Sequence, residues 1–378
     1  MVNVAVLGYG TIGSGVVEVL QTNTEVIAQR AGEEIAVKYI LDLRDFPGDP
    51  NADKVVHDYD IIDKDEDVQV VVECMGGVEP AYTFVKRALL NGRSVATSNK
   101  ELVAKHGAEL IAIAHEKNIN FLFEASVGGG IPIIRPLVQC LTADVIEEVS
   151  GILNGTTNYM LTRMKEEGIS FEEALKEAQE KGYAELHPEA DVEGYDACRK
   201  IAILTSLVAG KTVDFHKIHT EGIAGIDPTD FAYAKKLDAT IKLLAVSRET
   251  EDGYQISVAP YLLKKENALA GVNDVFNAVA VCGNTLGDTM FYGRGAGKLP
   301  TASAVVADVV ECARHLQKTV GCLWEEGEAK VADFDSQEGR FFVRVLKKAR
   351  ADVEKVFGAV VPVVLDSALE EFAFVTES

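Results

Sequence analysis

The sequence predicts an α/β protein: a doubly wound parallel sheet, a separate α+β substrate domain and a small β-α-β-β tail. Three observations predict this. Short apolar segments alternate with amphipathic helical patterns over the first 135 residues, as in βαβ units. The first apolar segment, 2–7, leads directly into a Gly-x-Gly-x-x-Gly pattern. Beyond about residue 240, four segments alternate apolar and polar residues as antiparallel strands do.

The glycine pattern is typical of a loop that binds a dinucleotide. A strand precedes it, and a helical pattern follows it through Leu20. In such a loop the first glycine permits a tight turn, the second lets a pyrophosphate approach, and the third allows the helix to pack on the strand. A tight turn without a ligand is the alternative. The setting favours a Rossmann-type NAD or NADP site at Gly8, Tyr9, Gly10, Thr11, Ile12 and Gly13.

An acidic and a basic residue close the second expected strand, 35–41. Asp42 at this position normally binds the ribose hydroxyls of NAD, whereas Arg44 would meet the 2′-phosphate of NADP. Asp42 lies 29 positions after Gly13 (42 − 13), later than the usual interval of about 20. NAD is slightly favoured, and the use of both cofactors stays open.

Further loops are expected at the carboxyl edge of the sheet, which is its ligand side. The strand 68–74 ends in Met75-Gly76-Gly77, and the strand 94–98 ends just before Lys100 and a helix over 101–117. Lys100 is either a solvated turn lysine or a ligand contact. The glycine-rich stretch 124–132 is either a hinge or a site for a hard monovalent cation bound by carbonyl groups and Glu124.

The segment 182–200 is the strongest candidate for a substrate site. It reads as a polar loop, followed from about Asp196 by a helix that is apolar on nearly every side. Glu185, Asp191 and Asp196 crowd beside Lys200. An ordinary helical ion pair is the alternative for Asp196 and Lys200. A carboxylate cluster beside one lysine is what a site needs to hold an ammonium group and supply a proton.

The composition argues against several classes of partner. The formal net charge of −22 opposes binding to nucleic acid and to anionic membranes. No apolar run approaches the roughly 20 residues that span a bilayer. The N-terminus lacks the basic region of a signal peptide, and the six cysteines show no Cys-x-x-Cys spacing. These features predict a cytoplasmic protein with reduced cysteines.

Taken together, these motifs resemble those of the homoserine dehydrogenases over about residues 1–320. The motifs that carry the resemblance lie at 8–13, 97–100, 124–132, 151–159, 182–200, 292–297 and 300–303. The resemblance implies an oxidoreductase that interconverts L-homoserine and L-aspartate 4-semialdehyde by hydride transfer with NAD or NADP. It also implies a place in threonine, methionine and isoleucine biosynthesis, and a homodimer or homotetramer.

The resemblance also implies a role for individual residues. Lys200 matches the proton donor, and Lys100 matches the lysine that contacts nicotinamide and substrate oxygen. Substrate binding is implied for Glu185, Asp191, Asp196, Thr156 and Gly155. Cofactor contacts are implied for Gly76, Ser98, Lys100, Gly182 and Gly297. Ligation of Na⁺ or K⁺ is implied for the Glu124 carboxylate and the carbonyl groups of Val127, Gly129 and Ile131.

The expected domains are three. A dinucleotide-binding domain covers 1–135 and is completed by about 293–320, and a substrate-binding and dimerisation domain covers 136–292, with 275–281 as a candidate exposed interface strand. The tail, 336–378, reads as strand 340–346, helix 349–357 and strands 360–365 and 372–375. This order looks like a truncated ACT domain without its second helix and last strand. Feedback by threonine therefore stays open beside a docking or oligomerising role.

Two other functions remain as alternatives. One is a dehydrogenase of the same architecture that acts on a different amino-acid aldehyde or a sugar. The other is a non-catalytic nucleotide sensor. A sugar substrate would not need an acidic pocket for an ammonium group, and a sensor would not need Lys100 and Lys200 together with that pocket.

Overall fold

The computed structural model of the protein describes residues 1–336, 338–367 and 370–377. The chain divides into two compact units. The first unit comprises Met1–Val149, Arg199–Lys217 and Ala278–Lys330, and the second comprises Ser150–Cys198, Ile218–Asn277 and Val331–Ser378. Each unit is thus assembled from three separate stretches of chain, and the division falls within one helix and two strands.

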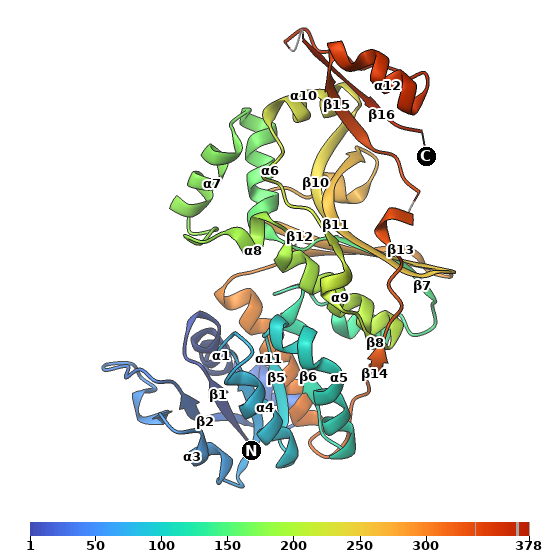
Figure 1. Ribbon diagram of the computed structural model, residues 1–378. Coiled ribbons are helices and arrows are strands. Elements are labelled where there is room, and N and C mark those ends of the chain that lie inside the picture. The colour runs from blue at the N-terminus through green and yellow to red at the C-terminus, as the bar shows by residue number, and fades with distance from the viewer. Residues whose placement is uncertain (337, 368–369, 378) are drawn as a thin grey trace. The chain divides into compact units, whose positions relative to one another are not determined.

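The first unit contains a six-stranded parallel sheet with the strand order β3-β2-β1-β4-β5-β6 (Figure 1). Its strands are β1 (Val2–Leu7), β2 (Ile35–Leu41), β3 (Val55–Val56), β4 (Val68–Glu73), β5 (Ser94–Thr97) and β6 (Phe121–Leu122). The chain builds one half outward from β1 and then returns to place β4 on the other side of β1. The carboxyl ends of β1 and β4 therefore meet at a switch point, with Leu7 opposite Glu73. The doubly wound sheet that the sequence predicts is confirmed.

Helices cover this sheet through apolar side chains. The helices that lie wholly within the first unit are α1 (Thr11–Thr22), α2 (Thr24–Ala31), α3 (Tyr59–Asp63), α4 (Ala81–Leu90), α5 (Lys100–Glu116) and α11 (Lys298–Arg314). Val4 and Val6 of β1 pack in one core with Val16 of α1 and Val305 of α11, and all four side chains are buried. Burial of each such valine contributes about 1.5–3 kcal/mol. The helix near residue 300 thus returns to the N-terminal sheet.

A second sheet is mixed, with the order β13-β12-β7-β10-β11-β9. Its strands are β7 (Ile146–Ile152), β9 (His219–Thr220), β10 (Ala239–Thr250), β11 (Gly253–Lys264), β12 (Phe276–Gly283) and β13 (Gly287–Arg294). β10 and β11 form a long antiparallel hairpin, but β9 pairs with β11 in parallel. The four segments expected as antiparallel strands correspond to β10, β11, β12 and β13, and β9 adds a parallel edge that the sequence did not predict. The expected exposure of 275–281 was wrong, because β12 lies between two strands and buries Ala278, Val279 and Val281.

Several of the remaining helices begin at a side-chain cap. The remaining helices are α6 (Gly155–Glu167), α7 (Phe171–Glu180), α8 (Glu189–Val192), α9 (Tyr195–Ala209), α10 (Pro228–Lys236) and α12 (Arg350–Phe357). Ser170 and Glu173 form a capping box at the start of α7, and Asp227 and Asp230 form one at the start of α10.

Short 3₁₀ turns occur at Ala52–Lys54, Glu124–Ser126, Phe215–Lys217, Ala268–Gly271, Phe334–Ser336 and Lys347–Ala349, and a π-helical turn occurs at Pro136–Cys140. A small pair, β8 (Lys211–Thr212) and β14 (Glu325–Glu328), completes the first unit.

The tail is a two-stranded sheet between two helices. β15 (Phe342–Leu346) and β16 (Glu371–Val375) pair antiparallel. Phe372 and Phe374 pack with Val353 of α12 on one face, whereas Ala373 packs with Tyr233 of α10 on the other. The expected strand 360–365 is reduced to a single bridge between Val363 and Ala373. The tail is therefore seated on α10 within the second unit.

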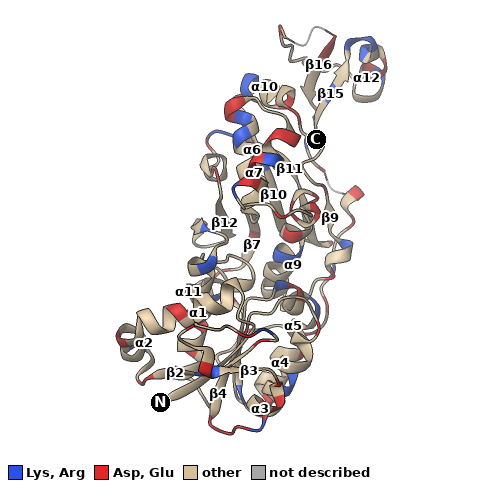
Figure 2. Cartoon of the chain, turned by 90° about the vertical axis from the view of Figure 1, so that its left-hand side faces the viewer, with Lys and Arg blue, Asp and Glu red and all other residues tan. Residues whose placement is uncertain are grey.

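Charged residues of both signs are interspersed along the chain. Figure 2 shows acidic and basic positions on the same elements, as on α10, which carries Asp230 together with Lys235 and Lys236. Among the described residues, no helix is both long and apolar enough to cross a membrane.

Candidate active site

The loop after β1 has the geometry of a phosphate-binding turn. Gly8 has a φ of +90°, and a Cβ added at Gly13 would lie 1.8 Å from the Gly8 carbonyl oxygen. At Gly10 an added Cβ would meet nothing within 4 Å. Gly10 caps α1 without a side-chain hydrogen bond, and the first turn of α1 contains no acidic residue. The N–H groups of Thr11, Ile12 and Gly13 thus begin a helix at a point that suits an anion.

Asp42 and Arg44 lie together directly beside this loop. One carboxylate oxygen of Asp42 accepts the Tyr9 N–H at 2.8 Å. Arg44 donates to both oxygens of Asp42, at 3.0 Å and 2.9 Å. The Arg44 guanidinium holds the pKa of Asp42 far below its usual range. The Arg44 side chain is 62% exposed, so it is able to leave Asp42 for a ligand at low cost.

The loops after β4 and β5 join through a residue that sequence reasoning did not single out, the buried Glu73. Gly76 is exposed with a φ of +79°, and the Ser98 N–H donates to the Glu73 carbonyl oxygen at 3.3 Å. The Asn99 side chain caps α5, which begins at the half-buried Lys100. Lys100 therefore occupies the first turn of a capped helix at the carboxyl edge of the sheet. It is not an unstructured turn lysine.

The Glu124 carboxylate is hydrogen-bonded to backbone N–H groups that follow in the same loop. Its carboxylate accepts N–H groups from Ile133 at 2.6 Å, Ile134 at 2.8 Å and Arg135 at 2.8 Å. Three acceptor positions are therefore used, and a carboxylate offers about four. Gly129 and Ile131 are buried, as is Val127. Among the described residues, no group of three or more His, Cys, Asp and Glu side chains has the arrangement of a metal site.

This loop packs against the glycine-rich loop that precedes α11. The Gly130 N–H donates to the Arg294 carbonyl oxygen at 3.1 Å. A Cβ added at Gly129 would lie 2.2 Å from the carbonyl oxygen of Gly295. Gly297, with a φ of +121°, caps α11. The two glycine-rich loops are thus in direct contact within the first unit.

In the second unit, Asn154 joins two of the predicted substrate carboxylates. Its side-chain amide donates to Asp191 at 2.8 Å and to Asp196 at 3.0 Å. The same side chain caps α6 by accepting the Thr157 N–H at 2.9 Å. Asp196 is 3% exposed at the start of α9. Sequence reasoning missed this role, although an asparagine before Gly-Thr-Thr is a recognisable capping signal.

The other predicted substrate residues lie on a more open segment. Gly182 and Glu185 are exposed. The Thr156 hydroxyl donates to the Tyr183 carbonyl oxygen at 2.6 Å, which ties the start of α6 to this segment. Gly155 packs closely on the backbone at Val275, because an added Cβ would lie 2.9 Å from the Val275 carbonyl oxygen. The structure joins Asp191 and Asp196 through Asn154, and it holds Glu185 on the exposed part of the loop.

Lys200 lies one turn after Asp196 on α9 and is half-buried. The preceding residue, Arg199, forms an ion pair of 3.7 Å with Glu101. Glu101 follows Lys100 in the first turn of α5. This contact, which the sequence did not indicate, joins the start of α5 to the part of α9 that belongs to the first unit. The two predicted lysines are each next in sequence to a member of that ion pair.

Comparison with known proteins identifies the family to which this chain belongs. The family model described as "Homoserine dehydrogenase" matches residues 132–310, and the model described as "Homoserine dehydrogenase, NAD binding domain" matches residues 8–124. Together they cover well over half of the chain. The chain belongs to the homoserine dehydrogenase family.

Individual relatives agree with this assignment. The homoserine dehydrogenase of Neisseria gonorrhoeae is 43% identical over 319 residues, which is 84% of this chain and 73% of the relative. That of Bacillus subtilis is 40% identical over 357 residues, 91% of this chain and 81% of the relative. The crystal structure of a homoserine dehydrogenase from Thiobacillus denitrificans has a TM-score of 0.91 at 35% identity, covering 100% of this chain and 91% of that one. A hyperthermophilic archaeal homoserine dehydrogenase solved with NADPH has a TM-score of 0.70 at 28% identity, covering 82% of this chain and 97% of that one.

Proposed function

We propose that the protein interconverts L-homoserine and L-aspartate 4-semialdehyde, with the nicotinamide of NAD or NADP as hydride carrier. The observation that carries the proposal is the construction of α9. One helix carries the buried Asp196 in its first turn, joined through Asn154 to Asp191, and carries Lys200 one turn later. This pairing suits a substrate that carries an ammonium group and exchanges a proton at oxygen. A sugar substrate carries no ammonium group and would not need this pair of carboxylates.

The division of labour follows from the chemistry of the reaction. When bound, the nicotinamide ring accepts hydride from the hydroxyl-bearing carbon of homoserine or returns it to the aldehyde carbon. We assign Lys200 as the group that gives a proton to the aldehyde oxygen during reduction and takes it back during oxidation. Lys100 would orient the same oxygen and contact the nicotinamide. Glu185, Asp191 and Asp196 hold the amino group, while Thr156 and Gly155 shape the wall beside them.

The dinucleotide fits the loop after β1 on the grounds of that loop's own geometry. The helix start lacks a side-chain cap, and Gly10 leaves space in front of it. We infer that Asp42 would accept the ribose hydroxyls, which favours NAD, and that the exposed Arg44 would meet a 2′-phosphate. We therefore propose that both cofactors are used, with NAD slightly preferred. Gly76, Ser98, Gly182 and Gly297 are proposed to contact the cofactor.

The test is the absorbance of reduced nicotinamide after the purified protein is mixed with homoserine and either NAD or NADP. Homoserine-dependent reduction supports the activity. The ratio of the two rates reports on Asp42 and Arg44, and Arg44→Ala should lower the NADP rate while sparing the NAD rate. If the protein binds NADH but reduces neither cofactor, the activity on homoserine is wrong.

A monovalent cation site remains a proposal with its own test. The carbonyl groups of Val127, Gly129 and Ile131 would supply most of the ligands, because Glu124 already accepts three N–H groups. We expect turnover to rise with Na⁺ or K⁺ at constant ionic strength relative to choline. A rate that is the same in all three salts would argue against the site.

Three further properties belong to the same proposal. We propose that the functional domains follow the sequence boundaries of 1–135 with 293–320, 136–292 and 336–378. We also propose a cytoplasmic homodimer or homotetramer, which light scattering after gel filtration would establish. Regulation by threonine through the tail is tested by adding threonine to the activity assay, and unchanged rates would leave the tail with a docking role.

A further inference from the structure

Glu73 is a buried carboxylate at the ligand edge of the parallel sheet. It is the last residue of β4 and is 0% exposed. In the sheet register it lies opposite Leu7 of β1 and Thr97 of β5. A buried carboxylate is costly unless its oxygens accept hydrogen bonds, so its partners report what it holds in place.

Those partners come from the two loops on its ligand side. One carboxylate oxygen accepts the N–H groups of Met75 at 2.7 Å and Gly76 at 3.3 Å. The other accepts the Thr97 hydroxyl at 2.6 Å. One side chain therefore fastens the loop after β4 to the end of β5. Burial raises the pKa of Glu73, and these donors oppose that rise by favouring the ionised form.

The hydrogen bonds continue from Thr97 to the start of α5. The Thr97 oxygen accepts the Asn99 N–H at 3.0 Å, and the Asn99 side chain accepts the Leu102 N–H at 3.1 Å. The Asn99 amide also donates to the Gly77 carbonyl oxygen at 2.6 Å. Lys100 is the first residue of α5, directly after Asn99. The position of the Lys100 backbone thus depends on a chain of contacts that begins at Glu73.

The loop after β4 also touches the dinucleotide loop. A Cβ added at Gly8 would lie 3.0 Å from the Met75 side chain and 3.1 Å from the Cys74 carbonyl oxygen. A displaced Met75 would therefore press on the turn that begins the phosphate-binding loop. Both ligand-side loops and the glycine loop are thus mechanically linked to Glu73.

We propose that Glu73 is a positioning residue: it fixes Lys100 and the loop 75–77 against the nicotinamide cofactor without touching reacting atoms. This inference rests on the proposed function where kcat is measured, and only on cofactor binding where the Kd for NADH is measured. The direction of the hydrogen bonds supports it. Asn99 donates to Thr97, and Thr97 donates to Glu73, so the Thr97 hydroxyl serves as acceptor and donor at once.

Thr97 offers a matched pair of variants. Thr97→Val keeps the shape but removes the hydroxyl, which leaves one Glu73 oxygen without its donor and the Asn99 N–H without its acceptor. Thr97→Ser keeps both hydrogen bonds. We expect Thr97→Val to lower kcat by about 10- to 100-fold, because misplacement of a reacting group by about 1 Å costs roughly 10²-fold. Thr97→Ser should stay within about threefold of wild type, and the KM for homoserine should be unchanged in both.

Glu73→Gln is the second variant, in case Thr97→Val fails to fold. Its amide oxygen can accept the loop N–H groups while its NH2 group faces the Thr97 oxygen, but the Thr97 hydroxyl then loses the acceptor that Glu73 supplies. We expect a kcat between those of the two Thr97 variants, with circular dichroism and the thermal midpoint recorded for each. Loss of kcat in Thr97→Val and Glu73→Gln with rescue in Thr97→Ser is the expected result. A kcat within about twofold of wild type in a folded Thr97→Val or Glu73→Gln protein would overturn the proposal.

The binding of NADH, followed by fluorescence, keeps this inference separate from the proposed function. We expect Thr97→Val to raise the Kd for NADH severalfold and Thr97→Ser to leave it unchanged. If wild type does not oxidise homoserine, the proposed function fails and this Kd comparison alone decides. An unchanged Kd in Thr97→Val would then overturn the role of Glu73.

Discussion

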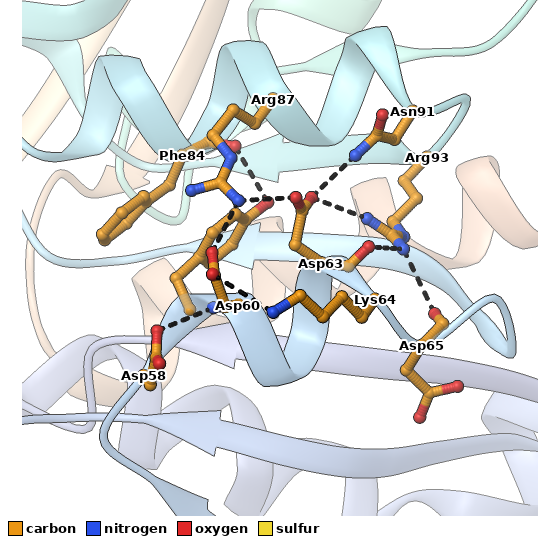
Figure 3. Close-up of polar contacts among 10 residues, drawn as sticks. Asp58, Asp60, Asp63, Lys64, Asp65, Phe84, Arg87, Asn91 and Arg93 are labelled. Atoms are coloured by element: carbon orange, nitrogen blue, oxygen red, sulfur yellow. Dashed lines mark hydrogen bonds and ion pairs between the residues drawn. The ribbon is translucent and has the colours of Figure 1, made fainter.

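The two ends of the parallel sheet hold their buried charges in different ways. At the amino end, Arg93 precedes β5 and is 6% exposed. It donates to the Asp63 carboxylate and to the carbonyl oxygens of Asp63, Asp65 and Val68. Figure 3 shows Asp63 between Arg87 and Arg93, with Asn91 reaching the same carboxylate. At the carboxyl end, Glu73 is instead held by a hydroxyl and two N–H groups.

This difference in hydrogen-bond partners indicates that the amino end of the sheet stabilises the fold and that the carboxyl end positions groups for the reaction. The amino-end cluster joins α3, α4 and β5 by paired charges, and Arg87 bridges Asp60 at 2.7 Å and Asp63 at 2.6 Å. Losing Arg93 there breaks a buried ion pair and leaves three backbone carbonyl oxygens without their donor, which is a stability effect. The carboxyl-end network places two loops and the start of α5. Damage there should change turnover more than it changes stability.

The largest expected effect is at the proton-transfer group. Lys200→Met should lower kcat by about 10²- to 10⁴-fold, because it removes the group that exchanges a proton with the substrate oxygen. The Kd for NADH should stay near that of wild type. Lys211→Met, two residues beyond α9 at an exposed position, is the matched control. Near-normal kcat in Lys200→Met would show that another group exchanges the proton.

At the amino end of the parallel sheet, a substitution should lower stability and leave kcat unchanged. Arg93→Met breaks a buried ion pair, which costs about 3–5 kcal/mol, and should lower the thermal midpoint by roughly 10 °C. Its kcat below that midpoint should equal that of wild type. The control is Arg30→Met, at an exposed position on α2. A large loss of kcat in folded Arg93→Met protein would remove the contrast between the two ends.

The substrate loop gives a smaller effect that separates binding from turnover. Glu185→Gln should raise the KM for homoserine by about 10- to 100-fold with little change in kcat, since one hydrogen bond to a charged group is worth about 1.5–3 kcal/mol. Glu189→Gln changes a neighbouring exposed carboxylate that we assign no role, and its KM should not move. If both variants raise KM equally, the general negative charge of the loop is responsible.

The sequence was informative wherever the pattern was local. The alternation of strands and helices predicted most of the parallel sheet, and the spacing of Gly8, Gly10 and Gly13 predicted its phosphate-binding turn. β7 was missed because Glu147 and Glu148 interrupt its apolar pattern. Its place in the sheet comes from long-range pairing, which local periodicity does not encode.

Contacts between distant residues explain the other omissions. Glu73 reads as the end of an apolar strand, and nothing near it signals a hydrogen bond to a hydroxyl 24 residues away. Lys242 reads as an outward-facing residue of an alternating strand but is 1% exposed. It donates to Asn158 and Asn273, each at 3.0 Å, and to the Val272 carbonyl oxygen. Such groups are satisfied by partners that only the folded chain brings together.

The tail has an ionic cluster of its own, which should contribute less to stability than the amino-end cluster and depend more on pH. Arg344 on β15 donates to Asp227 at 2.9 Å and 2.7 Å and to Asp230 at 2.8 Å, which fastens the tail to the start of α10. The hydrogen bonds from Arg344 lower the pKa of Asp227 to about 2. Asp227 is 42% exposed, so solvent screens the pair far more than it screens Asp63 and Arg93. Arg344→Met should therefore lower the unfolding midpoint by less than Arg93→Met does.

The dependence of that small effect on pH tests whether charge or packing holds the tail. The unfolded pKa of an aspartate is about 3.9, above the folded value for Asp227, so the folded state binds fewer protons between about pH 4 and 2. The stabilisation is then fully present above about pH 4 and is lost as the pH falls towards 2. We expect the difference in urea midpoint between wild type and Arg344→Met to be present from pH 7 to 4 and to shrink below that, with Arg340→Met showing no difference from wild type at any pH. A difference that persists at pH 2 would mean that the Arg344 stem, on the same face of β15 as Phe342, holds the tail by apolar contact. Burial would then outweigh charge even at this exposed pair.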